Sequence, residues 1–416
     1  MTAPRRSVSS PSLVSPTPTP RSTPLLVVLG MLSTFGPLTT DLYLPGLPEV
    51  ADELGTSDSQ VQLTLTACLI GLALGQAIVG PVSDTLGRRR PLLIGLGLFV
   101  LASLGCAVAP SILVLDLLRL VQGLCGAAGI VLARAIVRDR WSGLEAARIY
   151  AGLMTALSLG PILAPTIGGG LLHLTDWRGL FVVLAGWGVA LLVGAAIWVP
   201  ETLPASRRRP AGLGRTLRVM RQLLRDRVFT GYTVGAGLSF GALFSYIAGS
   251  SFVFQDVYGV SPQVYALLFG LNGFALLGAS FTNHRLQERV GPVKLLRAGM
   301  LTMLAGGALL TLAVLADAGL LAVVASLFVA VAGIGFVPSN GVALALEHHG
   351  TDAGTASALI GVVQFLIGAL AAPLPGLAGA TAVPMALGVL GFAVAALVTV
   401  RVVVGSHGVE HAREAA

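Results

Sequence analysis

The sequence predicts an all-α protein that spans a membrane about twelve times, built as two pseudo-symmetric six-helix bundles. Three observations predict this fold. Only 11% of the 416 residues are charged and the mean hydropathy is +0.85, whereas a soluble domain carries about 25% charged residues. The apolar residues fall into segments of about 20, the length that a helix needs to cross a bilayer. One long polar gap divides these segments into two nearly equal groups.

The predicted spans follow one another with short breaks. They cover residues 25–46, 60–82, 91–109, 112–136, 147–171, 179–199, 229–254, 263–283, 292–315, 319–345, 355–375 and 383–404. The polar gap at 200–228 is rich in arginine and is expected to be a cytoplasmic linker between an N-terminal bundle at 25–199 and a C-terminal bundle at 229–404. Residues 1–24, rich in Ser, Pro and Thr, are expected to form a disordered cytoplasmic tail. Residues 405–416 would form a second cytoplasmic tail.

The charges between the spans predict the orientation. The N-terminal tail and the loops after spans two, four, six and eight hold nearly all of the bases, such as Arg88 and Arg138. The opposite loops are acidic and hold one base, Arg178. Because basic loops stay in the cytoplasm, both termini and the central gap are expected on that side. The loop after span ten, with Glu347 and Asp352, breaks the bias and is assigned by count alone.

The chain contains a weak internal repeat. Residues 151–157, Ala-Gly-Leu-Met-Thr-Ala-Leu, are echoed at 353–359 by Ala-Gly-Thr-Ala-Ser-Ala-Leu, an offset of 202. Gly87 after span two matches Gly291 after span eight, an offset of 204. Two similar offsets near half the chain length indicate duplicated halves, an architecture typical of transporters whose site lies between the halves.

Composition argues against several other classes. The net charge of +7 comes from bases clustered between apolar runs, without interleaved aromatics, so we expect no nucleic-acid binding. Cys68, Cys106 and Cys125 lie inside apolar runs and are expected to be packing residues. No His, Cys and acid spacing resembles a metal site, and no nucleotide loop or catalytic triad is present, so we expect neither an enzyme nor a cofactor. The expected partners are the lipid bilayer and a small molecule, with the protein a monomer.

A motif between spans two and three combines glycine, aspartate and arginine. Residues 80–90 read Gly-Pro-Val-Ser-Asp-Thr-Leu-Gly-Arg-Arg-Arg. Gly80 allows close helix packing, Asp84 can bridge to bases or to a helix end, and the arginines anchor the loop at the inner face. The motif resembles the cytoplasmic loop motif of the major facilitator superfamily, which implies a conformational role for Gly80, Asp84, Gly87, Arg88 and Arg89. A generic basic loop is the alternative.

Span five carries a second motif, with Gly160, Pro161, Pro165 and Gly168 in the segment Gly-Pro-Ile-Leu-Ala-Pro-Thr-Ile-Gly-Gly. A proline inside a span removes a backbone hydrogen bond, and glycines beside it allow tight packing against another helix. The segment resembles the antiporter motif of the drug-exporting members of the superfamily. An ordinary kinked packing helix is the alternative.

A third set of residues narrows the resemblance. Residues 39–48 read Thr-Thr-Asp-Leu-Tyr-Leu-Pro-Gly-Leu-Pro. With 119–123 in span four, and 354–359 and Gln364 in span eleven, they are similar to the Bcr/CflA drug-resistance subfamily. The resemblance implies the twelve-helix major facilitator fold in a bacterial inner membrane and proton-coupled efflux of small organic drugs, typically bicyclomycin- or chloramphenicol-like antibiotics. The alternative is a proton-coupled transporter of an endogenous metabolite on the same fold.

Asp41 and Arg119 are predicted to couple the proton to the cargo. At 1.5 Å per residue, Asp41 lies about 24 Å from the cytoplasmic end of span one and Arg119 about 12 Å from the outer end of span four, so their depths overlap. A charge inside the membrane is costly and marks a functional site by default. An arginine favours the ionised form of a neighbouring aspartate, whereas burial opposes it. As alternatives, Asp41 caps its helix at the headgroup level, and Arg119 pairs with Asp116.

The cargo cavity is predicted from the remaining polar and aromatic residues of the spans. Ser33 stands where some drug antiporters of the superfamily have a second acid, which favours neutral or zwitterionic cargo. Aromatic rings with a few polar groups suit a drug-sized pocket, although ordinary helix packing would explain each one equally well. The further candidates are Tyr43, Gln122, Tyr232, Phe240, Phe244, Tyr246, Asn272, Asn340 and Gln364.

Overall fold

A computed structural model describes residues 22–208, 213–347, 349, 353–378 and 381–404 of the chain. Within these ranges the regular structure is entirely helical, without a strand. The predicted tails lie outside the described residues, apart from residues 22–24, which begin the first helix.

The N-terminal half, which we call the N-bundle, contains α1 (Ser22–Ser33), α2 (Phe35–Asp41), the short helix η1 (Leu44–Gly46), α3 (Leu47–Glu53), α4 (Asp58–Leu86), α5 (Arg89–Ala107), α6 (Ile112–Arg140), α7 (Gly143–Leu171) and α8 (Trp177–Trp198). The segment between the halves holds η2 (Ala205–Arg207) and α9 (Leu213–Leu223). The C-terminal half, the C-bundle, contains α10 (Arg227–Phe252), η3 (Val253–Val257), α11 (Pro262–Val290), α12 (Pro292–Leu315), α13 (Gly319–Leu346), α14 (Ala353–Ala371), η5 (Leu374–Ala378), α15 (Val383–Thr399) and η6 (Val400–Val404).

The number of spans agrees with the prediction. Within the described ranges, eleven segments are long and apolar enough to cross a membrane, and the bent pair formed by α1 and the helices that follow it supplies a twelfth. The prediction of an all-α protein with about twelve spans is therefore confirmed.

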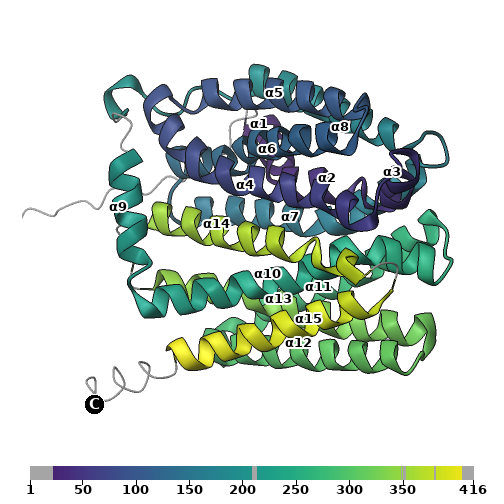
Figure 1. Ribbon diagram of the computed structural model, residues 1–416. Coiled ribbons are helices and arrows are strands. Elements are labelled where there is room, and N and C mark those ends of the chain that lie inside the picture. The colour runs from purple at the N-terminus through teal and green to yellow at the C-terminus, as the bar shows by residue number, and fades with distance from the viewer. Residues whose placement is uncertain (1–21, 209–212, 348, 350–352, 379–380, 405–416) are drawn as a thin grey trace, which may run out of the picture.

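The two bundles lie against each other along their length (Figure 1). Across their boundary α4 packs on α14, and α7 packs on α11. Helix α9 crosses one end of the molecule, at the left of Figure 1, and we call this end the linker end. The opposite end, which carries α3, is the far end.

The first span is broken, unlike the continuous segment expected at 25–46. Its two parts, before and after Thr34, meet at a bend of 43°. Pro37, Pro45 and Pro48 explain the interruptions, because proline has no N–H to donate to the carbonyl four residues earlier. The helix α2 accordingly ends at Asp41, four residues before Pro45.

Two short turns at the far end share the sequence Leu-Pro-Gly-Leu. The first, residues 44–47, covers η1 and follows the broken first span. The second, residues 374–377, lies in η5 and follows α14. We call these segments the first and second LPGL turns. They belong to opposite bundles, and each follows the α-helical part of its span.

Glycines allow α4 and α6 to touch backbone to backbone. A methyl group at Gly71 of α4 would overlap the carbonyl oxygen of Leu120, and one at Gly123 of α6 would overlap the carbonyl oxygen of Cys68. Such small-residue contacts drive helix association in membranes, where lipid removes the usual hydrophobic force.

We therefore expect Gly71→Ala to destabilise the N-bundle by about 1–3 kcal/mol, the cost of overpacking a tight contact. Gly97→Ala on α5 is the matched control, because nothing lies within 4 Å of the position of its β-carbon. In a helix that is otherwise unaffected, alanine is favoured over glycine. Thermal unfolding of the purified protein in detergent should show a lower midpoint for Gly71→Ala alone. Equal midpoints for the two variants would contradict the close contact.

Candidate functional site

Asp41 lies inside the protein at the end of α2. Its residue exposure is only 2%. The Thr40 hydroxyl is 2.6 Å from Asp41 Oδ1 and 3.0 Å from the carbonyl oxygen of Gly36. A hydroxyl has one proton to donate and can also accept. Thr40 can therefore donate to an ionised Asp41, or accept from a protonated Asp41 while donating to Gly36.

Arg119 of α6 is fully buried in the N-bundle, with an exposure of 0%. Its Nη1 donates to the carbonyl oxygen of Thr39 at 2.8 Å and to Oε1 of Gln122 at 2.6 Å. The guanidinium lies over the ring of Tyr43, 5.0 Å from its centroid, and 5.6 Å from that of Phe181. Aromatic faces attract a desolvated cation at such distances. The Nε and Nη2 atoms have no hydrogen-bond partner.

The two predicted coupling residues do not form an ion pair. Within the described part of the chain, Arg119 lies within 4.0 Å of neither the Asp41 nor the Asp116 carboxylate. The link runs instead through the backbone, because Arg119 binds Thr39, two residues before Asp41. The charge of Arg119 nevertheless acts electrostatically on both carboxylates.

Two polar side chains hold Arg119 in place. Gln122 accepts from Arg119 and donates through Nε2 to the Ser103 hydroxyl of α5 at 2.7 Å, which in turn donates to the carbonyl oxygen of Phe99. Tyr43, which packs on Phe181, exchanges a hydrogen bond with Thr64 of α4. Gln122 and Tyr43 were predicted to line a cavity, but the structure places them within the N-bundle, around Arg119. Ser103 could not be predicted, since a serine within an apolar helix does not stand out in the sequence.

The motif between α4 and α5 forms a charged cluster at the linker end. Arg88, only 3% exposed, donates to Asp84 at 2.7 Å and to Asp139 of α6 at 2.8 Å. Gly87 has a φ of +87°, a left-handed conformation that favours glycine. The cluster thus joins Arg88 and Asp84, as the motif suggested, to Asp139, which sequence reasoning did not single out.

Glu201, at the start of the linker segment, completes this cluster. It accepts from the backbone N–H groups of Arg88, at 2.8 Å, and Arg89, and it pairs with Arg208 at 3.7 Å. Burial opposes its ionisation, but the N–H groups of Leu203, Arg88 and Arg89 and the charge of Arg208 hold the pKa of Glu201 below its usual value. The cluster therefore ties the linker segment to the motif. Arg89 also donates to the carbonyl oxygen of Ala196, near the end of α8.

The span-five motif packs α7 against the helix that carries Asp41. A β-carbon at Gly160 would lie 2.6 Å from Pro37, and one at Gly168 would overlap the carbonyl oxygen of Leu42. Pro161 and Pro165 lie inside a continuous α7. These glycines therefore let α7 lie directly beside α2, on both sides of Asp41 along the chain. Gly80 has nothing within 4 Å of its β-carbon position.

Most of the other candidate cavity residues belong to the C-bundle and pair with one another. Asn272 Nδ2 donates to the Tyr246 hydroxyl at 3.0 Å, and Asn340 Nδ2 donates to Asn283 Oδ1 at 2.6 Å. The acceptor oxygens of Asn272 and Asn340 have no partner. Among the remaining candidates, Phe240 packs against Phe244, Tyr232 is buried and Gln364 is half-buried. Ser33 of the N-bundle bonds a carbonyl of its own helix.

Comparison with known proteins places this geometry in a family. Residues 28–373 match the model of the Major Facilitator Superfamily. The chain is 44% identical over 363 residues to an uncharacterized MFS-type transporter, YdgK, of Bacillus subtilis, covering 87% of this chain and 90% of that protein. It is 34% identical to a bicyclomycin resistance protein homolog of Haemophilus influenzae, covering 83% and 87% respectively.

A solved D-xylose–proton symporter has the same fold, with a TM-score of 0.74 at 17% identity, over 91% of this chain and 97% of that one. At this identity the likeness concerns the fold alone. Three observations indicate the same family: the family model matches most of the chain, one relative is 44% identical, and the structure has the expected number of spans. The chain belongs to the Major Facilitator Superfamily and is a membrane transporter rather than an enzyme.

Proposed function

We propose that this transporter exports small organic drugs across the bacterial cytoplasmic membrane in exchange for protons. The observation that carries the proposal is Asp41, an acid buried in the protein where its span breaks. A buried ionisable group in a span is costly to maintain and is a candidate for a proton relay. The similarity to a bicyclomycin resistance protein homolog supports a drug as the exported compound.

Asp41 has surroundings suited to gaining and losing a proton. Asp41 is buried, the Thr40 hydroxyl bonds its carboxylate, and Arg119 binds the backbone two residues earlier. Burial disfavours a negative charge, whereas a hydrogen bond and a nearby positive charge favour it. Opposing influences of this kind allow a change in solvent access to alter the proton affinity. In the proposed cycle Asp41 takes up a proton from one side of the membrane and releases it to the other, with cargo moving in the opposite direction.

The cargo is proposed to be neutral or zwitterionic, as bicyclomycin- and chloramphenicol-like compounds are. In the N-bundle, Ser33 stands where some drug antiporters of the superfamily have a second acid, and Asp41 and Nη1 of Arg119 each bond a residue of the same bundle. The C-bundle offers amides and aromatic rings, including Asn272, whose free oxygen can accept a hydrogen bond. We further propose that the transporter works as a monomer, driven by the proton gradient without a cofactor.

The linker end is proposed to face the cytoplasm, because its loops carry the arginines. A cysteine at Arg207, which is exposed at this end, should resist an impermeant thiol reagent in intact cells. A cysteine at Leu174, 85% exposed in a far-end loop, should react. Mass-tag gel shifts would report the labelling, and the reverse pattern would overturn the orientation. The native cysteines are buried and free, so they add little background.

Asp41→Asn should abolish uphill transport driven by a pH gradient, because the amide cannot carry a proton. Exchange of cargo without a gradient should survive, since the amide keeps the size of the carboxylate. Asp116→Asn, the other acid near Arg119, is the matched control and should retain uphill transport. Drug accumulation in proteoliposomes measures both. An Asp41→Asn protein that still concentrates drug against its gradient would rule out Asp41 as the proton carrier.

Arg119→Lys should lower the transport rate about tenfold, because an ammonium lacks the planar fork that binds Thr39 and Gln122 together. Arg134→Lys on the same helix is the control, since Arg134 is an exposed residue, and it should transport normally. Initial rates in proteoliposomes, at matched protein levels, make the comparison. Normal transport by Arg119→Lys would show that charge alone suffices at this position.

A further inference from the structure

Hydrogen bonds at the two LPGL turns join the two bundles at the far end. The Ser251 hydroxyl of α10 donates to the carbonyl oxygen of Leu44 at 2.6 Å, and Gln255 Nε2 donates to the carbonyl oxygen of Pro45 at 3.1 Å. In the other direction, the backbone N–H of Gly376 donates to Gln62 Oε1 of α4 at 2.9 Å. Each LPGL turn is thus bound by a side chain of the opposite bundle.

The first turn lies where proline limits the hydrogen bonding of the helix backbone. Pro48 has no N–H to donate to the carbonyl of Leu44, which accepts instead from the backbone N–H of Leu47. A carbonyl oxygen has two lone pairs and can accept a second hydrogen bond. Ser251, which is fully buried, supplies this second donor, and Gln255 also donates to the Ser251 hydroxyl at 2.7 Å. Ser251 and Gln255 therefore bind the backbone at a turn where regular α-helical bonding is interrupted.

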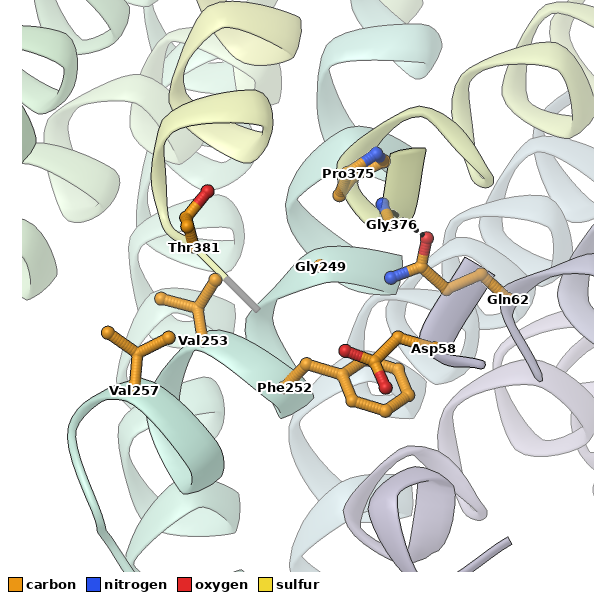
Figure 2. A pocket seen from close by; sticks show the side chains of 9 residues that line it. All are labelled: Asp58, Gln62, Gly249, Phe252, Val253, Val257, Pro375, Gly376 and Thr381. Carbon is orange, nitrogen blue, oxygen red and sulfur yellow. Dashed lines mark hydrogen bonds between the residues drawn. The ribbon is translucent and has the colours of Figure 1, made fainter. Parts of the chain in front are cut away.

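The second turn fits against α4 with almost no free space (Figure 2). A β-carbon at Gly376 would lie 2.6 Å from the Cα of Ser59 and 2.8 Å from Gln62 Oε1, so only glycine allows this approach. The remaining space around Gln62, Phe252 and Gly376 has a volume of about 10 Å³. That is about the least volume that holds one water molecule.

We propose that the two LPGL turns form the seal that closes the far side of the transporter, with Ser251, Gln255 and Gln62 as its positioning residues. The first turn begins three residues after Asp41, so the far side opens only when the segment that carries Asp41 separates from α10. The backbone from Asp41 to the first LPGL turn thereby links protonation of Asp41 to opening of the far side. This inference rests on the proposed proton-coupled transport, and it identifies the two LPGL turns as the part of the protein that opens.

The seal is tested by measuring the distance between the bundles at the far end. Spin labels at Leu174→Cys of the N-bundle and Leu321→Cys of the C-bundle, both highly exposed, report this distance in the liposome-reconstituted protein. Ser251→Ala and Gln62→Met should each raise the ratio of open to closed molecules about tenfold, in line with one lost buried hydrogen bond. Ser250→Ala is the matched control, since the hydrogen bonds of this neighbouring serine to other described residues stay within the C-bundle, with Ile247 and Tyr265.

Unchanged distances in both Ser251→Ala and Gln62→Met would overturn the seal. An equal shift in Ser250→Ala would also overturn it, because the effect would then be a general loosening of α10. Thermal unfolding of each variant shows whether it is folded. The measurement needs neither cargo nor a proton gradient, so its outcome is independent of the drug-transport assay.

The link to Asp41 is tested by a double-mutant cycle with the same labels. Asp41→Asn should change the ratio of open to closed molecules severalfold in the otherwise native sequence, and less in the Ser251→Ala background. Equal changes in the two backgrounds would show that Asp41 and the first LPGL turn act separately. A failure of Asp41→Asn to abolish uphill transport would instead refute the proton carrier and leave the seal standing.

Discussion

A helix that breaks inside a membrane must find partners for its backbone within the protein, because lipid offers none. The first span of this transporter is broken by prolines, and the carbonyl groups at the break are bound by other helices. Arg119 of α6 takes the carbonyl of Thr39, and Ser251 of α10 takes that of Leu44. The charged centre of the N-bundle and the contact between the bundles therefore both include backbone carbonyl groups of this interrupted span.

The glycines of α7 serve the same arrangement. They bring α7 against α2 on both sides of Asp41, so the acid is enclosed by close-packed backbone. At the linker end, Arg88 and Glu201 gather the loop, α6 and the linker segment into one cluster. Charged groups thus form the cluster at the linker end, whereas the hydrogen bonds that join the two bundles around the LPGL turns come from neutral groups.

The fold could be predicted from the sequence because each span is a run of about 20 mostly apolar residues, which is easily recognised. Asp41 and Arg119 could be found because charges in apolar segments are conspicuous. Ser103, which accepts from Gln122, and Ser251, which donates to Leu44, could not be found, since they look like ordinary small residues and meet their partners only in three dimensions. Whether Arg119 pairs with Asp41 or with Asp116 could not be predicted, because depth along a helix does not fix the direction of a side chain; in the described structure it forms an ion pair with neither.

The chemical nature of the far-end contacts has a consequence for how the transporter meets its surroundings. Leu44, Pro45 and Gly376 contribute backbone groups, and Ser251, Gln255 and Gln62 contribute a hydroxyl and amides, all of them uncharged. Dissolved salt screens interactions between exposed charges, but it has little effect on buried hydrogen bonds between neutral groups. The hydrogen bonds of this closure therefore depend little on salt. Titratable groups nevertheless stand beside them, since Asp58 lines the contact around Gly376 and Asp256 directly follows Gln255.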